Sequence, residues 1–379
     1  MRHSTRSFAS ILLAHVMIAG PSWSALAQQE GPKAPSQPET PPTPIQAGTQ
    51  APPEVPAGPT LKMGDAAPAL DIAKWLKGDE VKGFEKDKVY VLEFWATWCG
   101  PCIGAMPHLS KLQAKHADKG LRVLGITAED PNNSLATVQK FIEKKGSRAA
   151  YTLAWDNEGK TWTNYMVAAQ QRGIPCSFVI GKDGKVAFIG HPMTLEDVIP
   201  KVLAGTWKGQ EDVDAIMKAE EDFMQVFQQI ESDPKAALGE LEKYKEKYPS
   251  KKDQIASREM LLLMKAGEWD KAKSLNQRLA QKALDEKDSG ELETLAFFWM
   301  APMVNPEKKD LDVALDSAKR AVELTKEQEI SPLMTLAEIH LAMGEKDKAV
   351  ALGEKALKLS EDDREKAAIE RKVQEYKGK

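Results

Sequence analysis

The sequence predicts an α/β domain with a parallel-containing sheet, followed by an all-α domain. Short apolar, β-rich runs alternate with helical patterns over residues 61–207, and this alternation is typical of a sheet covered by helices. The strand signal ends near residue 209, and residues 211–379 are rich in Ala, Leu, Lys and Glu. Because these residue types favour helix, we expect the second domain to be entirely helical.

The composition argues against several classes of protein. The formal net charge of −4 argues against a nucleic-acid-binding protein, which would normally carry a basic patch. Three cysteines are too few for a disulfide scaffold or a four-thiolate zinc site. Beyond the N-terminus no apolar run reaches the roughly 18–20 residues that cross a bilayer, so we expect no membrane span in the mature protein.

Residues 1–27 are predicted to be an export signal. Arg2 and Arg6 precede an apolar stretch over residues 8–20, and Ala25-Leu26-Ala27 has the small residues of a cleavage site before Gln28. The alternative is an uncleaved membrane anchor, but the apolar stretch is interrupted early. We therefore expect a periplasmic or secreted protein.

A Pro-rich linker separates the signal from the first domain. Residues 28–60 contain ten prolines and cannot bury a core, so they are predicted to be disordered. The α/β domain then takes residues 61–207, with a hairpin turn at Lys182-Asp183-Gly184. Its predicted strands are 89–95, 121–127, 151–155, 177–180 and 186–190. Its predicted helices are 99–116, 134–145, 161–169 and 195–203.

The helical domain, residues 211–379, shows weak internal repetition. Near the C-terminus, Gly344 would allow a tight turn, and small residues such as Ala349 and Ala356 would let two helices pack closely. This pattern resembles tetratricopeptide helical hairpins, strongly over residues 331–361 and weakly over 254–325. The alternative is an irregular helical bundle. The resemblance implies a groove for a peptide or protein ligand.

Cys99 and Cys102 lie two residues apart, where the strand 89–95 is followed by a helix. This placement is typical of a redox dithiol. Two intervening residues let the sulfurs join once the first helical turn forms. Cys99 would lie at the helix N-terminus, where backbone N–H groups and the helix dipole lower the pKa of a thiol. Cys102, deeper in the helix, would then resolve the mixed disulfide.

Other uses of this cysteine pair are less consistent with the sequence. A zinc half-site would need a second pair of ligands, and neither Cys176 nor the six His residues provide one. A haem-attachment motif would need His after Cys102, where the sequence has Ile103. An inert structural disulfide is a further alternative. We expect no metal or organic cofactor.

The segment VLEFWATWCGPC, residues 91–102, resembles the active-site segment of thioredoxin-fold proteins, most closely the exported TlpA/ResA-like thiol-disulfide oxidoreductases. The resemblance covers residues 61–207 and implies a thioredoxin-like fold with a central mixed sheet. Four further motifs agree with it: the entry motif Gly64-Asp65-x-x-Pro68, the helix-kinking Met106-Pro107, the cis-proline loop Gly173-Ile174-Pro175 and the final hairpin Asp183-Gly184-Lys185.

The resemblance also implies roles for individual residues. Glu93 would be a buried carboxylate with a raised pKa that takes a proton from Cys102, the alternative being a solvent-facing Glu. Pro175 in cis would expose the backbone of Ile174 to an extended substrate, the alternative being a trans turn proline. The residues expected to contact the substrate are Trp98, Gly100, Pro101, Ile174 and Pro175.

Two positions depart from the family pattern or need a separate interpretation. Many TlpA-like members carry Glu three residues after the second cysteine, whereas this sequence has Ala105. Cys176 follows the cis-proline and would therefore lie near the dithiol. It is interpreted either as a buried inert thiol or as a third redox partner of Cys99 and Cys102. His108 and His116 lie on the predicted helix 99–116, and we expect both to be on the surface.

The predicted function is that of an exported thiol-disulfide oxidoreductase. Its partners would be protein disulfide or dithiol substrates, an upstream thiol electron donor or acceptor, and a peptide or protein bound by the helical domain. The alternatives are a peroxidase-type redoxin and a helical scaffold or chaperone-like protein with a secondary redox domain. The direction of electron flow depends on a reduction potential that the sequence does not indicate.

Overall fold

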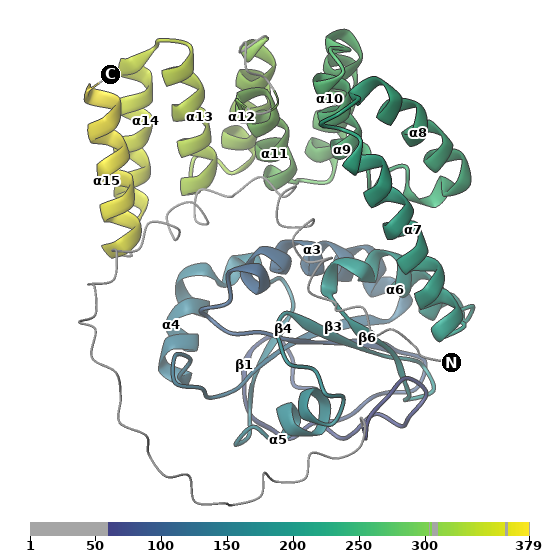
Figure 1. Cartoon of the computed structure of the whole chain (residues 1–379). Helices are drawn as coiled ribbons and strands as arrows, with labels where there is room; N and C mark the ends of the chain where they lie inside the picture. Colours follow the sequence, from purple (N-terminus) through teal and green to yellow (C-terminus); the bar gives the residue numbers. More distant parts are fainter. Residues whose placement is uncertain (1–59, 303, 305–309, 361–362, 379) are drawn as a thin grey trace, which may run out of the picture. The chain divides into compact units, whose positions relative to one another are not determined.

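The computed structural model describes residues 60–302, 304, 310–360 and 363–378 (Figure 1). The predicted export signal and the linker up to residue 59 lie outside the described residues. The chain divides into two compact units: a sheet unit, described from residue 60 to residue 217, and a helical unit from Lys218 onward. The division falls within helix α7 (Gln210–Gln228), because Ile216 is buried in the core of the sheet unit.

The sheet unit is built on one mixed six-stranded sheet within the described residues. Its strand order is β1-β4-β3-β2-β5-β6, with β2 parallel to β3 and antiparallel to β5. The strands are β1 (Ile72–Lys77), β2 (Val89–Phe94), β3 (Leu121–Thr127), β4 (Thr152–Asp156), β5 (Cys176–Ile180) and β6 (Val186–Gly190). This topology confirms the predicted thioredoxin-like α/β fold.

Five strands lie within one residue of their predicted bounds, whereas β1 was not predicted. β1 is an edge strand that pairs only with β4, and its register is interrupted twice. None of its six residues is fully buried, so its sequence lacks the apolar alternation from which strands are predicted. The predicted hairpin turn between β5 and β6 is confirmed, and Gly184 adopts a φ of 72° there.

Helices cover the two faces of the sheet separately (Figure 1). On β2, the side chains of Val89 and Val91 pack toward α3, α4 and α6, on what we call the α3 face. Those of Tyr90, Leu92 and Phe94 pack toward α5, on what we call the α5 face. The helices are α3 (Gly100–His116), α4 (Leu135–Lys145), α5 (Lys160–Trp162), continued by a π-helical turn (Thr163–Val167), and α6 (Leu195–Ala204). Short 3-10 turns lie at Ala117–Lys119, Gly146–Arg148 and Pro192–Thr194.

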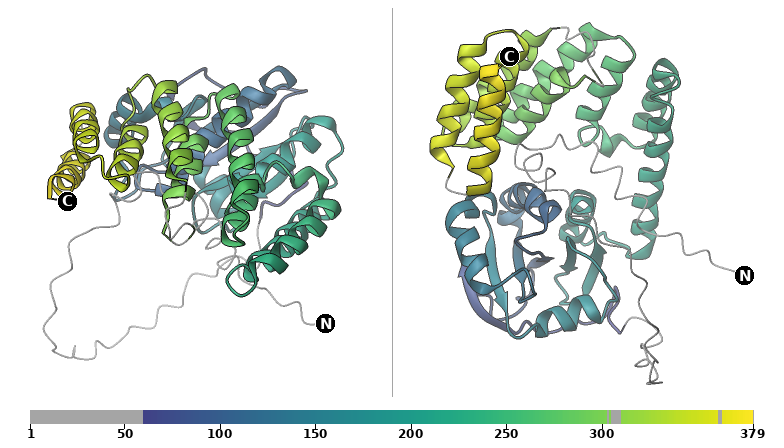
Figure 2. Two further views of the ribbon diagram at one scale, coloured as in Figure 1. Left: turned by 90° about the horizontal axis from the view of Figure 1, so that it is seen from above. Right: turned by 60° about the vertical axis from the view of Figure 1, so that its left-hand side comes forward.

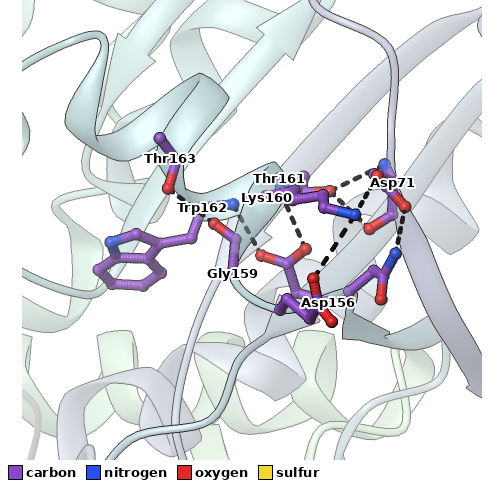
Figure 3. A network of polar contacts seen from close by, with 9 residues as sticks. Asp71, Asp156, Gly159, Lys160, Thr161, Trp162 and Thr163 are labelled. Atoms are coloured by element: carbon purple, nitrogen blue, oxygen red, sulfur yellow. Dashed lines mark hydrogen bonds and ion pairs between the residues drawn. The ribbon is translucent and has the colours of Figure 1, made fainter.

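A buried carboxylate, Asp156, joins the end of β4 to α5 (Figure 3). Its two oxygens accept the backbone N–H groups of Thr161 and Trp162, at 2.9 and 2.7 Å. Thr161 in turn exchanges hydrogen bonds with the backbone of Asp71, just before β1. The Lys160 ammonium lies 3.6 Å from the Asp71 carboxylate. These contacts hold the β1 edge and the start of α5 to the end of β4.

The helical unit is a series of helices that lie side by side, as both views of Figure 2 show. After α7 they are α8 (Pro234–Lys247), α9 (Ala256–Lys265), α10 (Trp269–Asp285), α11 (Ser289–Met300), α12 (Leu311–Leu324), α13 (Ile330–Ala342), α14 (Lys346–Leu359) and α15 (Asp363–Gly378). A 3-10 turn lies at Pro249–Lys251. None of the described helices is both long and apolar enough to span a membrane.

The predicted helical hairpin near the C-terminus corresponds to α13 and α14. Gly344 lies in the turn between them with a φ of 80°, and Gly267 lies between α9 and α10 with a φ of 77°. Ala349 and Ala356 are fully buried on α14, and Ala314 is fully buried on α12. Small buried residues and turn glycines thus have the roles that the repeat pattern assigns them, while the tetratricopeptide assignment itself stays a prediction.

Candidate active site

The cysteine pair lies at the beginning of α3. Cys99 and Cys102 form a disulfide, with their Cα atoms 5.3 Å apart. Cys99 is the N-cap residue, and its sulfur accepts the backbone N–H of Cys102 at 3.2 Å. Pro101 lies in the first turn, which contains no acidic residue. A negative charge on Cys99 would therefore meet helix N–H groups and no nearby carboxylate of that turn.

Glu93 lies on the α3 face of β2, below the dithiol helix. Its side chain is only 2% exposed, and it accepts a hydrogen bond from the Ser177 hydroxyl of β5. Burial raises the pKa of Glu93 to about 8, and the bond from Ser177 opposes that rise. The carboxyl group can therefore hold or release a proton near neutral pH, as a general acid or base must.

The Ile174–Pro175 peptide bond is cis, as the resemblance implied. Pro175 is buried directly before β5, whereas Ile174 is half-buried, and its backbone pairs with no strand among the described residues. The side chain of Ile174 packs against the hydrophobic clusters of both faces of the sheet. Because β5 pairs with β2, this loop lies at the edge of the sheet where β2 leads into the dithiol.

Trp98 is the large exposed apolar side chain next to the dithiol, with 55% of its surface accessible. Its indole N–H donates to the Asp130 carboxylate at 2.9 Å, in the loop after β3. Gly100 is half-buried, and Pro101 is exposed. Trp98 and Pro101 therefore offer accessible contact area beside Cys99, which is itself buried.

Asn133 orders the segment that precedes Cys99, a role that was not predicted from the sequence. Its side-chain oxygen accepts both the backbone N–H and the hydroxyl of Thr97, at 3.0 and 2.9 Å. Its amide nitrogen donates to the Thr127 hydroxyl at 2.9 Å and to the Ala128 carbonyl at 2.7 Å. A signal for this contact was present, because the carboxyl ends of the parallel strands β2 and β3 meet at one edge of the sheet.

Cys176 and the dithiol belong to different hydrophobic clusters of the sheet unit. It is a free, buried cysteine whose side chain belongs to the hydrophobic cluster of the α5 face, whereas Cys99 and Cys102 belong to the cluster of the α3 face. Its thiol is placed to donate weakly to the Gln171 side chain at 3.9 Å. Burial raises the pKa of the Cys176 thiol well above its ordinary value. This placement favours the inert buried thiol over the third redox partner.

The expectation that His108 and His116 lie on the surface is wrong. His116 is buried, and the His108 side chain is only 18% exposed. The reason is helical periodicity: Leu109 and Leu112 face the core, and His116 follows four residues after Leu112 on the same side of α3. Burial lowers the pKa of both imidazoles. Their distance along the helix from Cys99 gives them no place in the dithiol chemistry.

The AhpC/TSA family matches residues 63–189. Protein FixW of Rhizobium leguminosarum is 32% identical over 153 residues, which cover 39% of this chain and 69% of that protein. The thiol-disulfide oxidoreductase ResA of Bacillus thuringiensis subsp. konkukian is 32% identical over 128 residues, covering 33% of this chain and 68% of ResA. This chain belongs to the thiol-disulfide oxidoreductases. The solved thioredoxin domain of a thiol-disulfide oxidoreductase from Bacteroides vulgatus is 22% identical and covers 38% of this chain and 99% of that domain, with a TM-score of 0.32.

The matched part of this oxidoreductase contains every candidate residue of the dithiol site. Glu93, the Cys99–Cys102 pair and the cis Pro175 all fall within residues 63–189, whereas the helical unit lies outside them. Ala105, three residues after Cys102, is buried, and it stands where many TlpA-like proteins carry Glu. Among the described residues, no group of three or more His, Cys, Asp or Glu side chains is placed to hold a metal ion.

Proposed function

We propose that this chain is an exported enzyme that exchanges disulfides with protein substrates through Cys99 and Cys102, and that its helical unit recruits a protein partner. The observation that carries the proposal is the disulfide at the N-cap of α3, beside a cis proline and above a buried carboxyl group. The family assignment supports the reaction class, and the N-terminal pattern of residues 1–27 supports export.

The reaction begins on the reduced enzyme. The Cys99 thiolate attacks one sulfur of a substrate disulfide; a mixed disulfide forms, and the other substrate sulfur leaves as a thiolate. The helix N-terminus stabilises the attacking anion. An extended substrate segment can pair with the Ile174 backbone and rest on Trp98, which brings its disulfide to Cys99.

Cys102 completes the exchange. Its thiol gives a proton to the Glu93 carboxylate, directly or through water, and the resulting thiolate attacks the Cys99 sulfur. The enzyme disulfide forms, and the second substrate sulfur leaves and takes a proton from solvent. Two electrons have then passed from the enzyme dithiol to the substrate disulfide. The same steps run in reverse when the enzyme acts as an oxidant, so the reduction potentials set the direction.

A groove in the helical unit supports the recruiting role. It lies between α8, α9 and α10, and apolar side chains line it together with charges of both signs. Its lining includes Leu238, Leu263, Leu275, Glu242 and Arg278. Apolar surface flanked by both charge signs is suited to an extended or helical peptide rather than to a small ion.

The enzymatic proposal is tested by reduction of insulin with dithiothreitol as electron source. The wild-type protein is expected to accelerate the reaction, and Cys99→Ser is expected to reduce it to the uncatalysed rate, because the thiolate at the N-terminus of α3 that attacks the substrate disulfide is lost. Cys176→Ser is the matched control and should keep its turnover. Turnover by Cys99→Ser would contradict the assignment.

Two further measurements separate the alternatives. A peroxidase-type redoxin would consume hydrogen peroxide rapidly, and we expect little consumption. A scaffold or chaperone-like role predicts that the full chain carrying both Cys99→Ser and Cys102→Ser restores the phenotype of a deletion strain, and we expect no restoration. For export, sequencing the N-terminus of the mature protein is expected to give Gln28 as its first residue.

A further inference from the structure

Three buried polar atoms gather on the α3 face without hydrogen-bond partners among the described residues. They are one carboxyl oxygen of Glu93, the indole nitrogen of Trp95 and the hydroxyl of Tyr151. The three side chains are 2%, 1% and 4% exposed. Leaving a buried polar group unpaired costs about 1–3 kcal/mol each, so native proteins seldom tolerate such groups without a reason.

Gly125 of β3 brings the three side chains around one place. It lies directly opposite Glu93 in the parallel register of β2 and β3. A Cβ atom added at Gly125 would lie 2.7 Å from Cδ2 of Leu153, 3.1 Å from the Tyr151 ring and 3.2 Å from the Trp95 indole nitrogen. The absence of a side chain at Gly125 therefore lets both aromatic residues approach the strand beside Glu93.

The chemistry of the three atoms is complementary. The free oxygen of Glu93 accepts hydrogen bonds, the indole N–H of Trp95 donates one, and the Tyr151 hydroxyl can do both. None of the three is bonded directly to another. A buried water molecule typically makes about three hydrogen bonds to otherwise unpaired polar groups, and three such groups converge here.

We infer that Trp95 and Tyr151 are positioning residues for Glu93, and that one internal water molecule joins their N–H and O–H groups to its free oxygen. This inference rests on the proposed role of Glu93 as proton acceptor from Cys102. When the carboxyl group loses its proton in the buried site, the water turns a donor hydrogen toward the carboxylate, and Tyr151 and Trp95 hold that water in place. The proton itself still passes between Cys102 and Glu93.

The surroundings of Glu93 leave few other groups that could act in this way. From β5, Ser177 already donates to the other carboxyl oxygen, and Cys176 lies nearby on the opposite face. Burial raises the pKa of Tyr151 and that of Cys176 well above their ordinary values, so both stay neutral near pH 7. From α3, the disulfide does not titrate, and β3 presents only Gly125 opposite Glu93.

The test is the titration of Glu93 in the oxidised protein, followed by the carboxyl ¹³C shift of its side chain in NMR. Tyr151→Phe removes one hydroxyl and keeps the ring. Because the water that donates to the ionised carboxylate then loses one of the groups that hold it, the pKa of Glu93 should rise, by a three- to tenfold change in its acid dissociation constant, which is about the contribution of one hydrogen bond. Tyr165→Phe is the matched control, since that hydroxyl donates to the Pro68 carbonyl on the α5 face, and the Glu93 titration should not change.

A second variant, and an NMR signal from the water itself, allow the inference to be tested even if Tyr151→Phe folds poorly. Trp95→Phe keeps an aromatic ring against Phe141 and should raise the Glu93 pKa in the same direction. In the wild-type protein, the Trp95 indole proton should show cross-relaxation with a long-lived water molecule, and this signal should be lost in Tyr151→Phe. An unchanged Glu93 titration in both variants, an equal change in Tyr165→Phe, or no long-lived water at Trp95 would overturn the inference.

The outcome is separable from that of the proposed function. The titration observes the resting disulfide form and involves no turnover, whereas insulin reduction by the wild-type protein tests the enzymatic role. If insulin is not reduced but Tyr151→Phe raises the Glu93 pKa, the positioning inference stands and the proposed function fails. In the active enzyme, Tyr151→Phe should also move the pH profile of turnover to higher pH, which a purely structural substitution would not do.

Discussion

Two buried carboxyl groups in the sheet unit have opposite environments. Asp156, at the end of β4, has both oxygens paired with backbone N–H groups of α5 (Figure 3). Glu93, on β2, has one oxygen bonded to Ser177 and the other unpaired among the described residues. Burial raises the pKa of both groups. The backbone N–H groups of Trp162, Thr161 and Asn157 and the Thr161 side chain oppose that rise at Asp156, whereas the Ser177 hydroxyl alone opposes it at Glu93.

The difference separates a structural carboxylate from a chemical one. A side chain that only holds two elements together is most stable when every lone pair is matched, as at Asp156. A side chain that must gain and lose a proton during turnover needs an environment in which neither form is strongly favoured near neutral pH. A smaller number of direct hydrogen bonds from the protein beneath the dithiol is therefore expected of a proton acceptor.

The largest expected effect is the pH dependence that Glu93 imposes on stability. Its pKa is about 8 in the folded protein and 4.5 for an unperturbed Glu, so the folded state holds the proton over a range where the unfolded state has lost it. The free energy of unfolding should therefore fall as pH rises from 4.5 toward 8, by about 3 kcal/mol between pH 4.5 and pH 7. Urea unfolding of the oxidised protein across this range measures it.

Glu93→Gln provides the comparison for this measurement, because it cannot ionise. The unfolding free energy of Glu93→Gln should lack this decline. The wild-type value minus the variant value should therefore fall as pH rises from 4.5 to 8. Other titrating groups, including His108 and His116, are common to both proteins and cancel in the difference. A difference that stays constant between pH 4.5 and pH 8 would show that Glu93 is not held in a protonated state by burial.

Removal of the Asp156 carboxylate should affect stability and leave turnover nearly unchanged, with a smaller effect than the one expected at Glu93. Asp156→Ala leaves the N–H groups of Thr161 and Trp162 without acceptors and should lower the free energy of unfolding by about 2 kcal/mol at pH 7. Insulin reduction by the folded variant should stay within about twofold of wild type, because Asp156 binds α5 and not the dithiol helix. Thermal unfolding and the insulin assay on one preparation measure both quantities. A large loss of turnover with little loss of stability would place Asp156 in the chemistry instead.

Whether a residue of the dithiol site could be predicted from the sequence depends on how close it lies along the chain to the other residues of the site. The spacing of Cys99 and Cys102 was enough to predict a redox pair, whereas the cis bond before Pro175 was implied by the family resemblance. The role of Glu93 was also implied by the resemblance, and its alternation on an apolar strand supported its burial. Tyr151 and Asn133 reach the site from other strand ends, and strand order and register depend on long-range pairing that local patterns do not show.

The expected surface placement of His108 and His116 was wrong because the periodicity of α3 was not applied to them. His116 lies on the apolar side of α3, which the spacing from Leu109 and Leu112 indicates. Cys176 follows the cis proline in sequence, but side chains alternate along a strand, so Ser177 and not Cys176 faces Glu93. Nearness along the chain to a reactive loop therefore does not determine which face of the sheet a thiol occupies.

The smallest effect is expected at Cys176, and it tests the contrast between the faces. Cys176→Ser keeps a small side chain beside Gln171 but places a more polar group among apolar neighbours, so it should cost about 1 kcal/mol of unfolding free energy. The reduction potential of the Cys99–Cys102 pair, measured against glutathione, should equal that of wild type, because the substituted atom packs on the α5 face and the disulfide on the α3 face. A shifted potential, or a new disulfide pattern after mild oxidation that the substitution removes, would mean that the thiol reaches the dithiol during turnover. The sheet would then not separate the two sulfur environments.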